Sequence, residues 1–419
     1  MTPPSRAHVV GRRQLLRGVA AASAGFAVPL AGCGGGDASD ELVLWTISSF
    51  APSTDNALSK SLTEASEALG FPIHLEVFPH GSLRDKLITA VRGGAGPDVV
   101  SVDGAWTAQM AASGVAMDLS DKWASRAGEF FPGPAQTGSF DGKQYAVPWY
   151  ANNVALFYNQ EHFDKAGITQ APATWEDFLG AAKELTGGGQ HGFMVGTDLF
   201  GTFLFWPFLW QAGGAILDEA GANPTFASAA GHEAWEFLAG LYLTDQVVPS
   251  GITAVRNGWD ELWAPFVQGK VSMMMVGDWA ISALAESAPD LGYAIAPLPR
   301  HTERATVVGG YNLLIPTTSK RPDQAWRLVD WLTKPERDEL LASYDRMAAR
   351  KDASLDGLEE RYRVFRDQAD IARSRPSISQ WSAVEAIVGK HWDQTLQRQA
   401  SPAAALDAAA NEALAALSK

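Results

Sequence analysis

The stretch Gly96-Pro97-Asp98-Val99-Val100-Ser101-Val102-Asp103 has the pattern of a buried strand, because a short β-branched run follows a Gly-Pro turn signal. Upstream, strand-like runs at 41–45 and 73–77 alternate with helical patterns at about 55–69 and 82–91. This βαβα order predicts an α/β fold in which helices cover a mostly parallel sheet. Such sheets bind ligands at the carboxyl ends of their strands, which is where Asp103 stands.

The later chain continues this pattern without an internal repeat or a long low-complexity linker. Thr174-Trp175-Glu176-Asp177 predicts a helix that begins with a capping box, and Gly187-Gly188-Gly189 is expected to end it. Beyond about Asp323 the chain becomes largely helical. Ser401-Pro402 predicts the start of the last helix, with an apolar face formed by Leu406, Leu414 and Leu417. No single boundary divides the chain, so we expect it to cross between two lobes several times.

The first 33 residues read as an export signal. Arg12 and Arg13 open the run Arg-Arg-Gln-Leu-Leu-Arg, a small and apolar segment follows at 19–31, and Leu30-Ala31-Gly32-Cys33 closes it. This is a twin-arginine leader (1–32) that ends in what resembles a bacterial lipobox. In the lipoproteins that it resembles, the cysteine sulfur receives a diacylglyceryl group, so Cys33 would anchor the protein and 33–40 would be a tether. The alternatives are an ordinary secretory cleavage site or a membrane helix, although the apolar segment is shorter than the ~20 residues of a bilayer span.

Composition limits the possible partners and chemistry. Cys33 is the single cysteine, which excludes an intrachain disulfide and a cysteine-based metal site, and the eight histidines form no metal-ligand pattern. The leader carries four arginines and no acid, so its removal takes the formal net charge from −14 to −18. Such an acidic body argues against nucleic acid or anionic lipid as the main partner. The 419 residues, 46% of them hydrophobic, suffice for two domains.

A family resemblance follows from several motifs. The opening stretch, with Trp106, Gly114 and Asp118-Leu119, resembles the "PDV … G … DL" signature of extracellular solute-binding proteins of sugar ABC importers. Further matches come in the family's order and cover nearly the whole mature chain: Gly142-Lys143-Gln144-Tyr145-Ala146-Val147-Pro148-Trp149, Asn152, Leu156-Phe157-Tyr158-Asn159, Pro172-Ala173-Thr174-Trp175, Ala212-Gly213-Gly214, Phe266-Val267-Gln268-Gly269-Lys270 and Gly277-Asp278-Trp279. Related families bind maltose, trehalose and glycerol phosphate.

The resemblance implies a periplasmic-binding-protein-like fold, in which two α/β lobes are joined by a multi-crossover hinge with a ligand cleft between them. We expect lobe 1 to comprise 41–150 plus about 310–350, and lobe 2 to comprise 151–309 plus about 351–419. The crossovers are expected near 151–154 and 307–311. The implied partners are a small carbohydrate and the transmembrane subunits of an ABC permease. No cofactor or metal is expected, and we expect a monomer held to the outer face of the cell membrane.

A sugar site needs flat aromatic surfaces for the C–H faces of the ring, and planar polar groups for its hydroxyls. Fifteen tryptophans supply the first need. In lobe 1, Asp103 is expected to chelate two neighbouring hydroxyls, with Trp106 nearby; the alternative role for Asp103 is a helix N-cap. Asn152 matches the position of a polar ligand contact in maltose- and trehalose-binding proteins, beside Trp149 and Asn153. One of the two asparagines can instead hold the hinge.

Further candidates are carried over from the family by position. Trp279 matches a stacking tryptophan that follows Gly277, with a core position as the alternative, and Asp278 precedes it. Gly309-Gly310-Tyr311 stands where the chain is expected to return to the first lobe. There, backbone amides exposed by the paired glycines would suit hydroxyls, whereas a plain turn is the alternative.

The last candidates come from the aromatic-rich run after 200 and from the C-terminal region. In the trehalose-type binders that this chain resembles, an arginine beside the proline of Arg373-Ser374-Arg375-Pro376 reaches the ligand, and we select Arg375. Arg373 is the alternative, and either arginine can instead neutralise the acidic surface. Trp381 follows in the next helix. Phe203 resembles part of a second-lobe aromatic wall, whereas Trp206 is expected to be structural.

Three functions are compatible with these patterns. A binding protein without chemistry is favoured over a secreted glycosidase, because Gly-x-Ser-x-Gly and His-Glu-x-x-His are absent; carboxylate spacing alone does not exclude a glycosidase. Within the binding class, the rival to a sugar is glycerol phosphate or one of its diesters. Phosphate prefers a bidentate arginine or a bare helix N-terminus. The expected cleft offers one arginine among carboxylates and amides, which favours a sugar.

Overall fold

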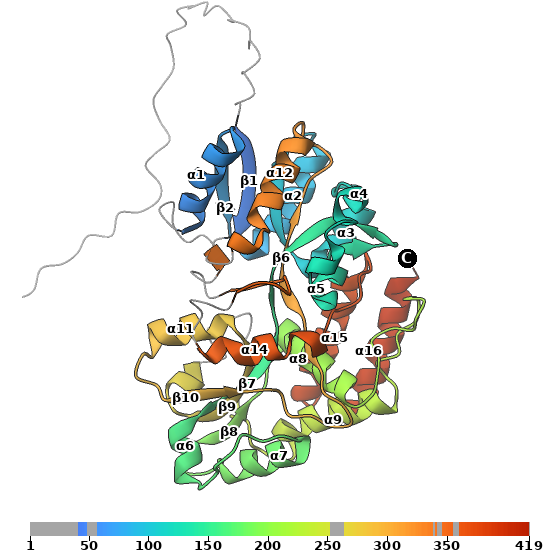
Figure 1. The fold of residues 1–419 in the computed structure, drawn as a ribbon. Coiled ribbons are helices and arrows are strands. Elements are labelled where there is room, and N and C mark those ends of the chain that lie inside the picture. The colour runs from blue at the N-terminus through green and yellow to red at the C-terminus, as the bar shows by residue number, and fades with distance from the viewer. Residues whose placement is uncertain are drawn as a thin grey trace, which may run out of the picture. The chain divides into compact units, whose positions relative to one another are not determined.

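The computed structural model describes residues 41–47, 57–251, 264–337, 340–341, 346–354 and 360–418. The predicted leader, the Cys33 lipidation site and the tether lie outside these residues. The described chain forms the mixed α/β, two-lobe fold that the sequence predicts (Figure 1). No described helix has both the length and the apolar character needed to cross a membrane.

The first sheet has six strands in the order β13-β6-β12-β3-β1-β2. β1 runs parallel to β2 and β3, as the βαβα pattern predicts, whereas β12 is antiparallel to both β3 and β6. The sheet is therefore mixed, because strands from distant parts of the sequence complete it. Its strands are β1 (Leu42–Ile47), β2 (Ile73–Phe78), β3 (Val99–Asp103), β6 (Ala146–Asn152), β12 (Gly309–Leu314) and β13 (Met347–Ala348).

Helices and short elements accompany this sheet along the chain. They are α1 (Ala57–Leu69), α2 (His80–Arg92), η1 (Gly104–Trp106), α3 (Thr107–Ala112), α4 (Ser120–Trp123), η2 (Ala127–Glu129), α5 (Pro132–Thr137), β4 (Ser139–Phe140), β5 (Lys143–Gln144), α12 (Pro322–Leu332) and η4 (Pro335–Arg337). In Figure 1, α1, α2 and α12 lie around β1 and β2. The side chains of this half form one buried hydrophobic cluster, which includes Leu44, Val100, Leu313 and Trp331.

The second sheet has four strands in the order β10-β7-β9-β8, with β9 parallel to β8 and antiparallel to β7. A separate hydrophobic cluster packs around it and includes Phe157, Trp206, Met273 and Trp392. The strands are β7 (Val154–Asn159), β8 (His191–Met194), β9 (Val271–Gly277) and β10 (Tyr293–Ala296). The two-stranded sheet that accompanies them pairs β11 (Thr306–Val307) with β14 (Ala372–Arg373).

The helices of this second half are α6 (Gln160–Lys165), α7 (Trp175–Glu184), α8 (Asp198–Gln211), α9 (Ala229–Leu243), α11 (Trp279–Ser287), η5 (Glu360–Tyr362), α14 (Arg363–Asp367), η6 (Ala369–Ile371), α15 (Trp381–Leu396) and α16 (Pro402–Leu417). α15 and α16 lie side by side (Figure 1). The aromatic run after residue 200 falls in α8, where Trp206 is fully buried as expected.

The chain passes from one sheet to the other at Asn153, which separates β6 from β7. Asn153 Nδ2 donates to the Phe365 carbonyl at 2.8 Å, and its Oδ1 accepts from Gln368 Nε2 at 3.2 Å. The Val154 N–H donates to Thr306 Oγ1 at 3.1 Å. Side chains from two later segments thus fix the backbone at this passage.

Helix ends test the local sequence predictions. The capping box of α7 is present, with the Asp177 N–H donating to Thr174 Oγ1 at 3.1 Å, but the helix ends at Glu184, before the predicted glycine stop. Ser401 caps α16 as predicted. The predicted apolar face of α16 is wrong at Leu414, which is 41% exposed. Leu406 is fully buried and Leu417 packs against the core, as predicted, and three alanines complete the buried side: Ala405, Ala409 and Ala413.

Candidate ligand-binding site

Asp103 ends β3 and takes the capping role that the sequence left open. Its Oδ1 accepts a hydrogen bond from the Ala105 N–H at 2.9 Å, so the side chain caps η1. The same oxygen lies 3.5 Å from Arg375 Nη2. A carboxylate at the carboxyl end of a parallel strand is thereby joined to the arginine selected from the C-terminal region of the chain.

Arg375 is held on several sides. Its Nη1 donates to Glu385 Oε1 at 3.0 Å, and its guanidinium lies 5.2 Å from the centre of the Phe203 ring. The Arg375 and Glu385 side chains are only 11% and 13% exposed. Burial acts to lower the pKa of Arg375, but attraction to Glu385 and Asp103 raises it overall. Burial raises the pKa of Glu385, while Arg375 acts against that shift.

Arg373, the alternative arginine, does not join this group. Its side chain pairs with Glu303 and is much more exposed than that of Arg375. Of the two arginines, Arg375 therefore enters the cluster.

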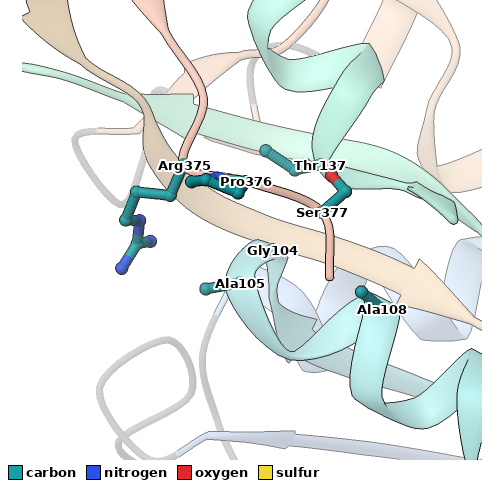
Figure 2. A pocket seen from close by; sticks show the side chains of 7 residues that line it. All are labelled: Gly104, Ala105, Ala108, Thr137, Arg375, Pro376 and Ser377. Atoms are coloured by element: carbon teal, nitrogen blue, oxygen red, sulfur yellow. The ribbon is translucent and has the colours of Figure 1, made fainter. Parts of the chain in front are cut away.

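A small pocket opens beside Arg375. Figure 2 shows Arg375, Pro376 and Ser377 lying across from Gly104 and Ala105. Gly104 fits this place because a Cβ there would lie 2.9 Å from the Cβ of Thr137. The residues that line the pocket are Gly104, Ala105, Ala108, Thr137, Arg375, Pro376 and Ser377.

Two aromatic side chains of the second half continue the cluster. The rings of Phe203 and Trp279 are 6.5 Å apart and inclined at 48°. Trp279 begins α11 directly after β9, and its ring lies over Gly277, where a Cβ would be 1.8 Å from the ring atom Cζ3. Gly277 thus allows the indole to lie across the end of the strand. Trp279 is half-buried, and Phe203 is buried, with a relative exposure of 8%.

Gly309 and Gly310 belong to β12, so they do not form a plain turn. They pair with Asn152 and Ala151 of β6. A Cβ on Gly309 would lie 2.1 Å from Asn152 Oδ1 and 3.5 Å from Phe203 Cζ, which places the Asn152 amide beside the cluster. The glycines are needed because β6 and β12 approach closely here.

Tyr311 follows in β12 and stacks on Tyr150, with ring centres 5.3 Å apart and an interplanar angle of 18°. Burial raises the pKa of Tyr150; Asp103 and Asp278 add to the increase, while Arg346 opposes it. The Arg346 guanidinium lies 6.0 Å from the Tyr150 ring centre. Asp278 itself is fully buried. These groups therefore share one electrostatic environment with Asp103.

Three predicted contacts are interior residues in this structure. Trp149 is 2% exposed within the core of the first sheet, and Trp381 is 1% exposed and packs on Trp206 at 5.6 Å between ring centres. The Asn153 amide is occupied at the passage between the sheets. These contacts give all three residues a structural role, and ligand contact at these positions stays a prediction. Trp106 is half-buried at the end of η1, with Arg84 5.8 Å from its ring centre.

Sequence reasoning missed Glu385 and Tyr150. Glu385 lies in a helix rich in polar residues, and only its burial against Arg375 distinguishes it from a surface acid. Tyr150 is adjacent to the quoted Pro148-Trp149 motif, but its pairing with Tyr311 depends on the register of two distant strands. Among the described residues, no group of three or more His, Cys, Asp or Glu side chains is placed to hold a metal ion.

The two-lobe α/β fold is that of the solute-binding proteins. Comparison with known proteins identifies the family. The chain belongs to the bacterial extracellular solute-binding protein family, which matches residues 51–339. It is 26% identical over 365 residues to a putative binding protein of Brucella abortus, with 84% of this chain and 87% of that protein covered. The chain is therefore a solute-binding component of an ABC importer, with an extracytoplasmic location.

Two further relatives carry ligand information in their names. The diacetylchitobiose binding protein DasA of Streptomyces coelicolor is 25% identical over 393 residues, with 86% of this chain and 88% of that protein covered. A solved ABC transporter solute binding protein of Thermotoga lettingae, bound with α-D-tagatose, is 25% identical and superposes with a TM-score of 0.79. The superposition covers 90% of this chain and 100% of the Thermotoga lettingae chain.

Proposed function

We propose that this protein captures a mono-, di- or oligosaccharide at the cluster formed by Asp103, Arg375, Phe203 and Trp279, with Asn152 and Tyr311 at its border. The observation that carries the proposal is the approach of the Asp103 carboxylate, at the end of a first-sheet strand, to Arg375 and the Phe203–Trp279 pair. A sugar needs this combination, because its hydroxyls take planar polar partners and its C–H faces take aromatic rings.

Capture by hinge closure is part of the proposal. Lobe 1 would comprise 41–150 plus about 310–350, and lobe 2 would comprise 151–309 plus about 351–419. Polar contacts to the ligand would then come from both lobes, so that ligand binding favours the closed arrangement. The passage at Asn153 supports this, because a single residue there joins a strand of one sheet to a strand of the other.

The ligand names of two relatives support a carbohydrate. One binds diacetylchitobiose and the other was solved with α-D-tagatose, each at 25% identity over most of this chain. The corresponding test is a thermal-shift screen over mono- and disaccharides that includes both sugars and glycerophosphodiesters. A ligand that binds only the folded state raises the melting temperature by an amount that grows with the logarithm of its concentration relative to its Kd. A shift with glycerophosphodiesters alone would refute the carbohydrate assignment.

We also propose that the protein carries a lipid on Cys33, acts as a monomer and delivers its ligand to the transmembrane subunits of a permease. The supporting observation is the lipobox-like Leu30-Ala31-Gly32-Cys33 behind the twin-arginine run. Cys33→Ala should abolish incorporation of an alkyne-labelled fatty acid and leave carbohydrate binding unchanged, because the acyl chain needs the thiol. Equal labelling of the variant and the wild type would contradict lipid attachment at Cys33.

In this proposal the protein releases its ligand without altering it chemically, in keeping with a family of binding proteins rather than enzymes. The discriminating measurement is release of reducing sugar from a set of glycosides by the purified protein. We expect none above background. Turnover that disappears in Asp103→Ala would instead assign a glycosidase.

A further inference from the structure

Arg375 stands in a short segment, residues 374–377, which we call the strap. The residues on either side of the strap are attached to the second half of the molecule. Arg373 pairs with Glu303 and lies in β14, which pairs with β11. Ile378 packs against the second hydrophobic cluster. The strap therefore leaves the second half and returns to it within four residues.

The strap itself is attached to α5, a helix of the first half. Ser374 Oγ donates to Gln136 Oε1 at 2.7 Å. Ser377 Oγ donates to the Gln136 carbonyl at 2.9 Å. Gln136 thus holds the strap on both sides of Arg375, once through its side chain and once through its backbone.

Close packing supports the same attachment. Ala135 of α5 packs against the first hydrophobic cluster. A Cβ on Gly133 would be 2.7 Å from the Ala372 carbonyl oxygen, so this glycine lets α5 approach the backbone just before the strap. Pro376 and Ser377 line a small pocket together with residues of η1 and α3 (Figure 2). Pro376 also has a fixed φ, which limits how the strap can bend.

The Arg375 guanidinium, in contrast to its backbone, contacts both halves. Nη2 lies 3.5 Å from Asp103 Oδ1 at the end of β3. Nη1 donates to Glu385 of α15 at 3.0 Å, and the Phe203 ring centre lies 5.2 Å away. If the halves separate, one of these two sets of contacts has to break. The attachment of the strap to α5 indicates that the contact with Asp103 persists.

Resting on the proposed capture by closure, we propose that Gln136 is a positioning residue that keeps the strap on the first half, so that Arg375 and Asp103 form a preassembled polar side of the site in the open protein. The second half then brings Glu385 and the Phe203–Trp279 pair to this polar side as it closes. A ligand meets the groups that bind its hydroxyls before it meets the rings. Such preassembly lowers the ordering cost of binding.

A thiol-bridging experiment locates the strap in the open protein. Cys33 is the single cysteine, so Cys33→Ala provides a background without thiols. The pair Gln136→Cys/Ser374→Cys leaves the second hydrogen bond of the strap, to the backbone of residue 136, in place. Dibromobimane becomes fluorescent when it joins two nearby thiols. We expect equal bridging rates with and without the carbohydrate that gives the largest thermal shift.

The control pair is Gln136→Cys/Ser379→Cys. Ser379 lies beyond the strap and donates to Gln380 of its own segment, so this pair should bridge more slowly. For the Gln136→Cys/Ser374→Cys pair, bridging that requires the carbohydrate, or no bridging in the ligand-free protein, would place the strap with the second half and overturn the inference.

Failure of closure gives a different result. Small-angle scattering of the bridged protein should show the same decrease in radius of gyration with carbohydrate as the unbridged protein, because the bridge lies within the first half. A radius of gyration that stays constant in both would refute closure. The bridging rate of the ligand-free protein would then still decide whether the strap lies on α5.

Affinity tests the positioning role of Gln136. Gln136→Met keeps the length of the side chain and removes its acceptor, so the Kd should rise about two- to tenfold, as expected for the loss of one hydrogen bond. Gln136→Glu keeps an oxygen for the Ser374 hydroxyl and should restore most of the affinity. The Gln136 side chain is exposed, so neither change disturbs the core. Ser379→Ala is the matched control and should leave the Kd unchanged.

A double-mutant comparison separates positioning from general structural support. In the Arg375→Lys background, Gln136→Met should cause no further loss of affinity, because it acts through the position of Arg375. Equal losses in both backgrounds, in variants whose melting temperatures show that they are folded, would overturn the positioning role. A carbohydrate screen without a hit would refute the proposed function, while the bridging rate of the ligand-free protein still reported the place of the strap.

Discussion

At the scale of single residues, the binding free energy is expected to come from the Trp279 ring and the Asp103 carboxylate. If Trp279 stacks on a sugar face, Trp279→Ala should weaken binding by about 1–3 kcal/mol, because it removes a large apolar contact. Asp103→Ala should cost a similar or larger amount, because it leaves sugar hydroxyls desolvated without an acceptor. The ring variant should weaken related sugars together, whereas the carboxylate variant should reduce discrimination among epimers. Calorimetric titrations of both variants measure this difference.

Trp206→Phe is the structural control for that series, because Trp206 is fully buried in α8 and packs on Trp381. It should lower stability more than affinity. Wild-type affinity in both folded variants, Trp279→Ala and Asp103→Ala, would show that the ligand binds elsewhere in the chain.

Gly310 provides a second test at this scale. Its φ of +119° is rarely adopted by residues with a side chain, and a Cβ would lie 2.2 Å from the Tyr150 carbonyl oxygen. Gly310→Ala should therefore lower stability by about 1–3 kcal/mol, from backbone strain and the displacement of β6. Gly114→Ala is the matched control, since its φ of +70° is also strained but no atom lies within 4 Å of the added Cβ. Equal melting temperatures for the two variants would contradict the role assigned to close strand approach.

At the scale of elements, Asp118 connects the start of α4 to β5. Its Oδ1 accepts from the Ser120 hydroxyl at 2.6 Å, and Lys143 Nζ lies 2.9 Å from its Oδ2. These contacts lower the pKa of Asp118 to about 2, the hydrogen bond from Ser120 being the largest cause. A carboxyl whose folded pKa lies below its unfolded pKa stabilises the fold above the unfolded value. This contribution is lost as the pH falls from about 4 towards 2.

Asp118→Asn should therefore lower stability near pH 6, and the difference from the wild type should shrink as the pH falls towards 3. Urea unfolding at several pH values measures it, and a ¹³C titration of the Asp118 carboxyl gives the pKa itself. The effect is expected to be small, because both partners are partly exposed and solvent screens the pair. A difference that grows at low pH would have the wrong sign for this explanation.

The elements also show which features the sequence could predict. Local signals sufficed for β3, for the capping box of α7 and for the Ser401 cap, because each depends on neighbours within a few residues. Asp103 and Arg375 were found through family motifs. Glu385, Tyr150 and the close approach at Gly310 could not be predicted, because they depend on contacts between segments far apart in the sequence. The deep burial of Trp149 and Trp381 could not be predicted, because an indole that packs in a core has the same sequence signal as one that stacks on a sugar.

At the scale of the whole molecule, two separate hydrophobic clusters surround two sheets, and the candidate site draws residues from both halves. Asp103 belongs to the first sheet, whereas Phe203 and Trp279 pack with the second cluster. One ligand that contacts all of them would bridge the halves. Its binding free energy would then shift the equilibrium between open and closed arrangements.

Small-angle scattering of soluble Cys33→Ala protein, with and without the carbohydrate that gives the largest thermal shift, tests whether the two halves close around a shared ligand. We expect a smaller radius of gyration at saturating carbohydrate, and no change when the same sugar is added to Asp103→Ala at a concentration that leaves the variant unbound. Calorimetry in parallel establishes saturation of the first sample. An unchanged radius of gyration in the saturated protein would contradict capture by closure around a shared ligand.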